Sequence, residues 1–335
     1  MSSKRCCLIC VLLVLAVLVI AFLSVFVGFP ITFMLSIEIQ RLFLFEPVTG
    51  NRHEFNLSGV VPGGRNFYVT VNEDITLGVW HLLPQALLNV TQDDGEEALA
   101  KGDYPVLFHC HGNGGNRLYH LDVYLRLTKF FHVVGFDYRS YGDSTDAPLT
   151  EEGLVQDTVE LYKWLRNRTT ADIYVWGHSM GTAVSTLTVS RLRNLNIVPA
   201  GLILESPYTT LREEAVLFPP AKAMLWLPWF NSTILDPIWN NGFRFEISAH
   251  ISNVDCPVMI LHAKDDEIIP YQLAVKLYDI AIAKRNLTTQ GVVRLHLFEA
   301  DLHLQHWAIY KAPMLPEYIR EHMEDAQNYK RLNVT

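Results

Sequence analysis

The pentapeptide GHSMG at residues 177–181 constrains the fold of this chain more than any other segment. An apolar, strand-like run, 173–176, precedes it, and a run rich in Ala, Val, Thr and Leu, 182–192, follows it. This order predicts a strand, a sharp turn and a helix, with Ser179 at the apex of the turn. Glycines two positions before and after the serine have no Cβ, so the strand and the helix can approach closely. We therefore expect Ser179 to be a nucleophile whose hydroxyl is held in the open near the first amides of the helix.

Short β-rich runs alternate with helical patterns from about residue 46 onwards. Such alternation predicts a mainly parallel sheet covered by helices, and the first two runs read as an antiparallel pair. Together with the turn at Ser179, the pattern indicates an α/β-hydrolase fold with a mainly parallel, eight-stranded sheet. The predicted strands are 67–71, 75–81, 106–110, 132–138, 173–176, 201–205, 258–262 and 294–298.

In this fold the catalytic acid and base follow the nucleophile along the chain. Two adjacent aspartates, Asp265 and Asp266, lie in the loop after the predicted strand 258–262. We favour Asp266 as the acid because it stands four residues before Pro270, a spacing typical of this loop. Asp265 is the alternative, and it could instead be an acceptor that ties the loop together.

The catalytic base is expected after the last predicted strand, because a histidine in that loop can reach the nucleophile and the acid together. Two histidines, His303 and His306, lie there. We favour His306, which Trp307 follows, and keep His303 as the alternative. The imidazole would accept the Ser179 proton, and Asp266 would orient the ring and stabilise its charged form.

Two backbone amides are expected to hold the oxyanion of the reaction intermediate. One belongs to Met180, directly after the nucleophile. The other is assigned to Asn113, in the glycine-rich loop 111–116 that follows the predicted strand 106–110. A phosphate-binding loop is a weak alternative, because the Walker spacing and its Gly-Lys-Ser/Thr end are absent. This chemistry needs no metal or other cofactor, and the sequence has no His/Cys cluster with metal-ligand spacing.

Residues 6–29 form a nearly unbroken apolar run of 24 residues, long enough to cross a hydrocarbon layer of about 30 Å as a helix. Lys4 and Arg5 precede it, and positive charge tends to stay on the cytoplasmic side. We therefore expect a single-pass type II membrane protein in which residues 1–5 are cytoplasmic and the rest is lumenal or extracellular. A cleaved signal peptide would have a shorter apolar core and a small-residue cleavage site, which residues 27–30 do not resemble.

The remaining boundaries follow from shifts in composition. Pro30 is expected to end or kink the spanning helix. Residues 30–50 stay apolar with scattered charges, which indicates a linker that lies along the membrane interface. The hydrolase domain is predicted to span 51–325, and residues 326–335 are predicted to be a C-terminal tail.

The segment 208–251 interrupts the alternation of strands and helices. It is longer than a simple crossover and carries a dense aromatic run, so we predict a lid over the carboxyl edge of the sheet. We expect this lid to bind an acyl chain or to face the membrane; the alternative is a helix pair that packs on the core. The lid residues assigned to substrate binding are Met224, Trp226, Trp229 and Phe230.

N-x-S/T sequons are spread through the chain beyond the apolar run, which supports a lumenal domain. A sixth sequon, at Asn333, lies two residues from the end and is left out of the prediction. The net charge is −8 without a basic stripe, which argues against nucleic-acid binding, and the five cysteines show no disulfide framework. The expected glycosylation sites are Asn56, Asn89, Asn167, Asn231 and Asn286.

Five segments together resemble a known family. They are the amino-terminal apolar run, the HGN tripeptide 111–113, the DYRSYGDS segment 137–144, the pentapeptide 177–181 and the HWAIYKAP segment 306–313. These segments resemble the membrane-anchored α/β-hydrolase-domain lipases that cleave monoacylglycerols and lysophosphatidylserine, over roughly residues 6–325. The resemblance implies a Ser-Asp-His triad, a lipid substrate with one acyl chain and a membrane location such as the endoplasmic reticulum. The five residues before the apolar run are fewer than we expect for that family.

Two other functions stay open at this point. The same triad could remove acyl groups from proteins as a thioesterase, although S-acylated cysteines mostly face the cytoplasm and this domain is expected to face outward. A binding protein that keeps the fold without catalysis is the second alternative. The presence of Ser179, Asp266 and His306 argues against it.

Overall fold

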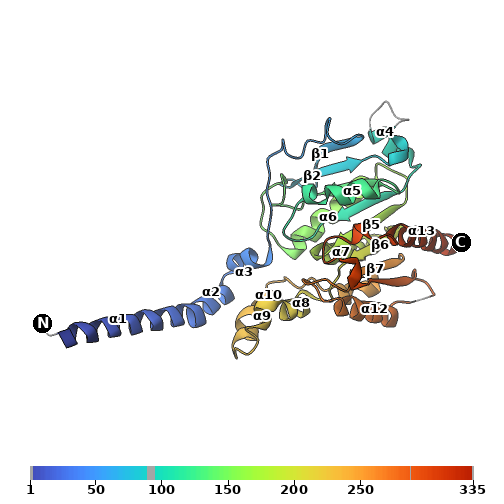
Figure 1. Cartoon of the computed structure of the whole chain (residues 1–335). Coiled ribbons are helices and arrows are strands. Elements are labelled where there is room, and N and C mark those ends of the chain that lie inside the picture. The colour runs from blue at the N-terminus through green and yellow to red at the C-terminus, as the bar shows by residue number, and fades with distance from the viewer. Residues whose placement is uncertain (1–2, 89–94, 287, 334–335) are drawn as a thin grey trace.

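The computed structural model describes residues 3–88, 95–286 and 288–333, and within them the chain forms one eight-stranded sheet (Figure 1). The strand order is β1-β2-β4-β3-β5-β6-β7-β8; β2 is antiparallel to both β1 and β4, and the other neighbours are parallel. The predicted α/β-hydrolase fold is confirmed. The strands are β1 (Gly64–Thr70), β2 (Thr76–Leu82), β3 (Val106–Cys110), β4 (His132–Phe136), β5 (Ile173–His178), β6 (Gly201–Glu205), β7 (Val258–Ala263) and β8 (Val293–Phe298).

The register of the central strands brings their carboxyl ends to one edge of the sheet. Cys110 of β3 pairs with Gly177 of β5, and His178 of β5 pairs with Glu205 of β6. Every residue of these three strands is buried, as parallel strands covered on both faces require. The loops that leave these strands therefore begin side by side, and those after β3 and β5 carry Asn113, Ser179 and Met180.

Helices cover both faces of the sheet and create two hydrophobic cores. One core packs α6, α7 and α12 against the sheet, and the other packs α5 and α13. The predicted boundary at residue 325 falls inside α13, where Ala326 is buried in the second core. The helices are α4 (Gly95–Lys101), α5 (Leu121–Leu127), α6 (Glu151–Arg166), α7 (Met180–Asn194), α12 (Gln272–Lys284) and α13 (Leu315–Asn333).

The amino-terminal helices project away from the hydrolase domain as a long rod (Figure 1). They are α1 (Ser3–Leu23), a π-helical turn (Ser24–Gly28) and α2 (Phe29–Leu35), followed by α3 (Ile37–Leu44). The stretch Leu8–Leu35 is long and apolar enough to cross a membrane, and its most apolar part is not buried by the rest of the protein.

Pro30 was predicted to end or kink the spanning helix, but the helix does not end there. Pro30 lies in the first turn of α2, a position where the missing N–H is tolerated. The π-helical turn before it widens the backbone, and the Thr32 hydroxyl donates to the Gly28 carbonyl at 2.9 Å. The helical path therefore continues to Leu35, and Ser36 separates it from α3.

The lid segment lies beside the amino-terminal helices (Figure 1). Leu227, Phe230 and Leu235 form a small third core, against which Phe26 of the π-helical turn packs. The side-chain amide of Asn241 donates to Gln40 of α3 at 2.7 Å. The lid helices are α8 (Leu211–Leu217), α9 (Pro219–Lys222), a π-helical turn (Asn231–Leu235), α10 (Asp236–Asn240) and α11 (Ile247–His250).

Exposed apolar side chains gather on this end of the molecule. In the lid, Trp226 is 75% exposed, and on α3 Leu42 is 78% exposed. Large apolar groups left in water are costly when they cluster, so this distribution is typical of a face that meets a membrane. The other exposed large apolar residues of α3 and the lid are Phe43, Leu217, Phe218 and Leu225, and Leu35 at the end of α2 is also exposed.

Candidate active site

Ser179 stands at a strained turn between β5 and α7. Its φ of 53° and ψ of −123° lie outside the regions that non-glycine residues normally adopt. Its backbone N–H donates to the carbonyl of Glu205 at 2.9 Å, which ties the turn to the end of β6. Met180 begins α7, so its amide is among the first N–H groups that have no partner within the helix.

The two glycines of the pentapeptide are required by close contacts. A Cβ on Gly177 would lie 2.3 Å from the carbonyl oxygen of Gly181, and one on Gly181 would lie 2.1 Å from that of Cys110. Both distances are far inside van der Waals contact, and the atoms met are backbone. Only glycine therefore allows α7 to start this close to β3 and β5.

The structure brings Asp266 and His306 together at the carboxyl edge of the sheet. Nδ1 of His306 lies 2.7 Å from Oδ2 of Asp266, and both side chains are buried. The other carboxylate oxygen accepts the backbone N–H groups of Ile268 and Ile269, each at 2.9 Å. Burial alone would raise the pKa of Asp266, but hydrogen bonds from His262 and His306 hold that pKa well below its ordinary value. The carboxylate is therefore ionised and oriented, as the acid of a triad must be.

The alternative residues lie differently. Asp265 accepts the backbone N–H of Gln305 at 3.1 Å, so it ties the acid loop to the base loop. His303 is exposed, with a φ of 50°, and no partner of its imidazole is found among the described residues. Neither residue takes part in an Asp–His contact.

The structure does not show a hydrogen bond between Ser179 and His306. Among the described residues the serine hydroxyl makes no hydrogen bond. Catalytic hydrogen bonds are often long without substrate and shorten in the complex. The ring of His178, next to the serine, lies 5.0 Å from that of His306, so nucleophile and base share one small region.

The glycine-rich loop after β3 packs directly on the nucleophile turn. A Cβ on Gly112 would lie 3.2 Å from Cβ of Ser179 and 3.0 Å from Cδ2 of His178, so glycine permits this approach. The next residue, Asn113, carries the amide assigned to the oxyanion. Within the described part of the chain, that amide has no hydrogen-bond partner.

The side chain of Asn113 has a role that sequence reasoning missed. Its Oδ1 accepts the N–H of Glu46 at 2.9 Å and the hydroxyl of Tyr141 at 2.6 Å. Its Nδ2 donates to the carbonyl of Leu44, the last residue of α3, at 2.8 Å. The oxyanion loop is thus hydrogen-bonded to the segment that leaves the membrane-proximal helix.

A buried ion pair holds the far end of the same loop. The Arg117 backbone and guanidinium both donate to the Asp137 carboxylate, and the guanidinium also reaches Asp143 at 2.7 Å. Burial raises the pKa of Asp137 to about 6, while Arg117 opposes the rise. Because a buried charge is costly without its partner, this contact holds the end of the loop against the segment that follows β4.

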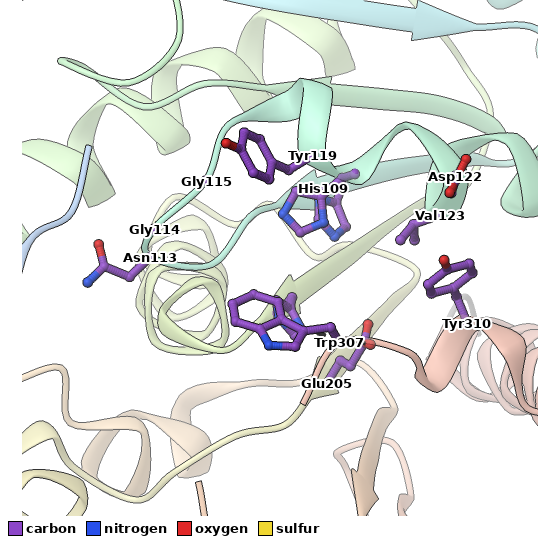
Figure 2. Close-up of a pocket in the computed structure, with 12 residues that line it drawn as sticks. His109, Asn113, Gly114, Gly115, Tyr119, Asp122, Val123, Glu205, Trp307 and Tyr310 are labelled. Carbon is purple, nitrogen blue, oxygen red and sulfur yellow. Dashed lines mark ion pairs between the residues drawn. The ribbon is translucent and has the colours of Figure 1, made fainter. Parts of the chain in front are cut away.

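A cavity of about 400 Å³ adjoins these loops (Figure 2). In the figure Asn113 lies toward one end, Tyr310 toward the other, and Trp307 between them. His178 and Glu205 also line it, and neither was expected from the sequence. The signal was a carboxylate at the end of the otherwise apolar strand 201–205, which predicts a buried acid beside the nucleophile. Among the described residues no group of His, Cys, Asp and Glu is arranged to hold a metal ion.

The predicted lid residues do not line this cavity. Trp226 is exposed, Phe230 is buried in the small core of the lid, and Met224 and Trp229 are partly buried against that core. The structure therefore places the aromatic run beside the amino-terminal apolar helix and not beside the cavity.

Comparison with known proteins identifies the family of this chain. Residues 106–308 match the Alpha/beta hydrolase family. The chain belongs to this family. The match covers the strands β3 to β8 and the loops that carry Ser179, Asp266 and His306.

Similar proteins include lipases of one type. The lysophosphatidylserine lipase ABHD12 of Danio rerio is 39% identical over 263 residues, which are 76% of this chain and 68% of that protein. The protein of the same name from Gallus gallus is 36% identical over 316 residues, 91% of this chain and 82% of that protein. Protein ABHD12B of Homo sapiens is 30% identical over 78% of this chain and 73% of its own length. The resemblance described from the sequence is confirmed.

Solved structures support the fold. The Pyrococcus furiosus esterase Pf2001 has a TM-score of 0.57 at 17% identity, covering 85% of this chain and 97% of that one. A bacterial membrane phospholipase A has a TM-score of 0.53 at 14% identity, covering 97% and 99%. At such low identities the likeness concerns the fold alone.

The neighbouring aspartates provide a matched test of the acid. Asp266→Asn removes the charge that orients the His306 imidazole, so kcat on a short soluble ester should fall by about 10³- to 10⁴-fold. Asp265→Asn removes only a loop contact and should cost less than tenfold. Initial rates of both purified variants, with melting temperatures to verify folding, separate the two residues. A larger loss in Asp265→Asn than in Asp266→Asn would reverse the assignment.

Proposed function

We propose that this chain is a membrane-anchored serine hydrolase that cleaves the acyl ester of monoacylglycerols and lysophospholipids such as lysophosphatidylserine. The observation that carries the proposal is the buried His306–Asp266 contact, 2.7 Å long, beside the strained turn of Ser179. The lipase names of the relatives at 36–39% identity support carboxylic-ester hydrolysis and the lysolipid class. The aligned part covers 68% of the Danio rerio protein and 66% of the Rattus norvegicus protein, and we therefore propose the substrate on the active-site geometry as well.

The residues have the following roles in the proposed reaction. His306 accepts the proton of Ser179 as the hydroxyl attacks the ester carbonyl, and Asp266 stabilises the imidazolium. The amides of Asn113 and Met180 hold the oxyanion, a contribution of about 3 to 4 kcal/mol per donor in a comparable enzyme. The leaving alcohol receives the proton from His306, and water then releases the fatty acid from the acyl-serine by the same steps in reverse. No cofactor takes part.

The anchor places this chemistry at a membrane. We propose that Leu8–Leu35 spans the bilayer, that residues 1–5 are cytoplasmic, and that the catalytic domain is lumenal, in the endoplasmic reticulum. The exposed side chains of Asn56, Asn167, Asn231 and Asn286 support glycosylation, while Asn89 lies outside the described residues. A lumenal domain also disfavours the thioesterase alternative, because acylated protein cysteines mostly face the cytoplasm.

The lid forms the membrane-facing side of the domain in this proposal. Its exposed Trp226 and Leu225 lie in the same segment as Phe230, whose core contacts Phe26 of the anchor. An acyl chain that leaves the bilayer beside the anchor would meet the lid before it reaches Ser179. The small core, with Met224 and Trp229, holds the lid against the anchor.

Replacement of the nucleophile tests the proposed function. Ser179→Ala keeps a Cβ at the strained φ, so the fold should be retained while turnover falls by more than 10³-fold. A panel of lysophosphatidylserine, a monoacylglycerol and an acyl-cysteine thioester, assayed on both proteins, identifies the substrate class. Wild-type protein that cleaves only the thioester would favour the second enzyme class. Failure of a fluorophosphonate probe to label it would favour a non-catalytic protein.

Glycosylation tests the orientation. Asn167 is exposed at the carboxyl end of α6, away from the lid, and should carry a glycan in a eukaryotic cell. Treatment with an N-glycosidase should increase the gel mobility of the wild-type chain, and Asn167→Gln should lose part of that shift. Mobility that does not change on treatment would contradict a lumenal domain.

Two tryptophans of the lid test its contact with the membrane. Trp226→Ser removes an exposed ring, so the ratio of long-chain monoacylglycerol to short soluble ester turnover should fall roughly tenfold, with an unchanged melting temperature. Trp229→Ser removes a ring packed on the lid core, so it should also lower the melting temperature. An equal loss on both esters for Trp226→Ser would discard the lid hypothesis.

A further inference from the structure

We propose that the cavity beside the triad binds the alcohol half of the substrate and is built to recognise the hydroxyl groups of a glycerol. This inference rests on the proposed function and adds which leaving alcohol the site selects. The residues that carry the argument are His109, His120, His178, Glu205, Trp307 and Tyr310 (Figure 2). A volume of about 400 Å³ lies within the range of small-molecule sites.

The position of the cavity is set by the three catalytic loops. His178 precedes the nucleophile, Trp307 follows the proposed base, and Asn113 itself belongs to the oxyanion loop; all three line the cavity. The His178 ring lies 5.3 Å from Trp307 and 5.0 Å from His306. A group that fills the cavity is therefore next to the reacting atoms.

The chemistry of the reaction assigns this space to the leaving alcohol. When the tetrahedral intermediate collapses, the bond from the acyl carbon to the leaving oxygen breaks, and the electron pair stays on that oxygen. His306 gives it the proton taken from Ser179, while the acyl group stays on the serine. The leaving oxygen must then lie within reach of His306, so the rest of the alcohol extends over the adjacent Trp307. No residue of the lid segment lines the cavity in the described structure, which leaves the lid side for the acyl chain.

The floor of the cavity carries buried polar atoms that lack partners. His178 is 3% exposed, and neither of its ring nitrogens has a hydrogen-bond partner among the described residues. Glu205 is 4% exposed; its Oε2 accepts the Trp176 indole at 2.8 Å, and its Oε1 lies 3.7 Å from His178 Nδ1, too far for a hydrogen bond. Nε2 of His109 is also unpartnered within the described chain. Buried polar groups are normally satisfied, so these atoms are available to a polar ligand in the cavity.

The protonation states of the cavity residues suit the hydroxyl groups of a glycerol. Burial lowers the pKa of His178 and His109 well below the usual range, and that of His120 to about 4, so all three rings are neutral at pH 7. Burial raises the pKa of Glu205 to about 7, with Asp266 adding to the rise and the Trp176 hydrogen bond opposing it. No lysine or arginine is among the residues that line the cavity in the described structure. Neutral imidazoles and a carboxyl near its pKa can donate to or accept from the hydroxyl groups of the glycerol unit, which monoacylglycerols and lysophospholipids share.

A partition experiment with the wild-type protein tests the proposal without any mutation. The full-length protein in detergent micelles is given methyl oleate together with glycerol or 1-propanol at equal concentration. If the cavity binds glycerol, the acyl-serine should pass its acyl group to glycerol several-fold more often than to propanol, forming monooleoylglycerol. The glycerol hydroxyl gives its proton to His306, and the serine recovers it. Equal capture of the two alcohols would overturn the proposal, whereas no release of methanol at all would overturn the proposed function instead.

A pair of glutamate variants tests the residues. Glu205→Gln keeps an acceptor for Trp176 but removes the titrating carboxyl, and the ratio of kcat/KM for monooleoylglycerol to that for methyl oleate should fall about tenfold. Glu160→Gln, a matched change on the outer face of α6, should leave this ratio as in the wild type. The acyl chain is the same in both esters, so the ratio reports only on the alcohol half. An unchanged ratio in Glu205→Gln, with its melting temperature preserved, would overturn the assignment of this residue.

Discussion

The close approach of α7 to strands β3 and β5 is the constraint on which the active site depends. It is possible because Gly177 and Gly181 have no side chains; a Cβ on either would meet a backbone carbonyl oxygen within 2.3 Å. The helix start is thereby held against the sheet, and Ser179 is forced to a φ of 53°. A side chain at either glycine would displace the nucleophile and the Met180 amide together.

Buried charges near this turn are compensated by contacts from several loops. Asp266 accepts two backbone amides and the imidazole of His306, and Asp137 accepts the guanidinium and amide of Arg117. The partners of Asp266 come from its own tight turn and from the loop that carries His306. The partner of Asp137 comes from another loop, the one that follows β3. Removal of one partner would leave an uncompensated buried charge, so the loops of the site hold one another in place. Glu205 and His178 differ, because they line the cavity, and the His178 ring nitrogens have no hydrogen-bond partner among the described residues.

The membrane-proximal end of the chain and the catalytic loops are directly connected. Asn113 accepts from Glu46 and donates to Leu44, so the oxyanion loop is fixed to the segment that leaves α3. The lid core contacts Phe26 of the anchor, and Asn241 contacts Gln40. These contacts orient the hydrolase domain relative to the amino-terminal apolar helix, as the proposed cleavage of a single-chain lipid at a bilayer requires. The same end of the molecule carries the exposed apolar residues.

The sequence by itself determined the features that depend on neighbouring residues. The eight strands, the turn around Ser179 and the apolar run can be predicted, because periodicity, glycine spacing and length are local properties. For the acid and the base, the sequence indicated only their order along the chain. Asp265 and His303 therefore remained alternatives to Asp266 and His306. Tertiary structure decided that Asp265 ties two loops, that Asn113 binds the linker and that the lid packs on Phe26. It also brought Glu205 beside His178, since two residues 27 positions apart meet only through the register of β5 and β6. Such contacts are set by packing between distant segments, and no local pattern encodes them.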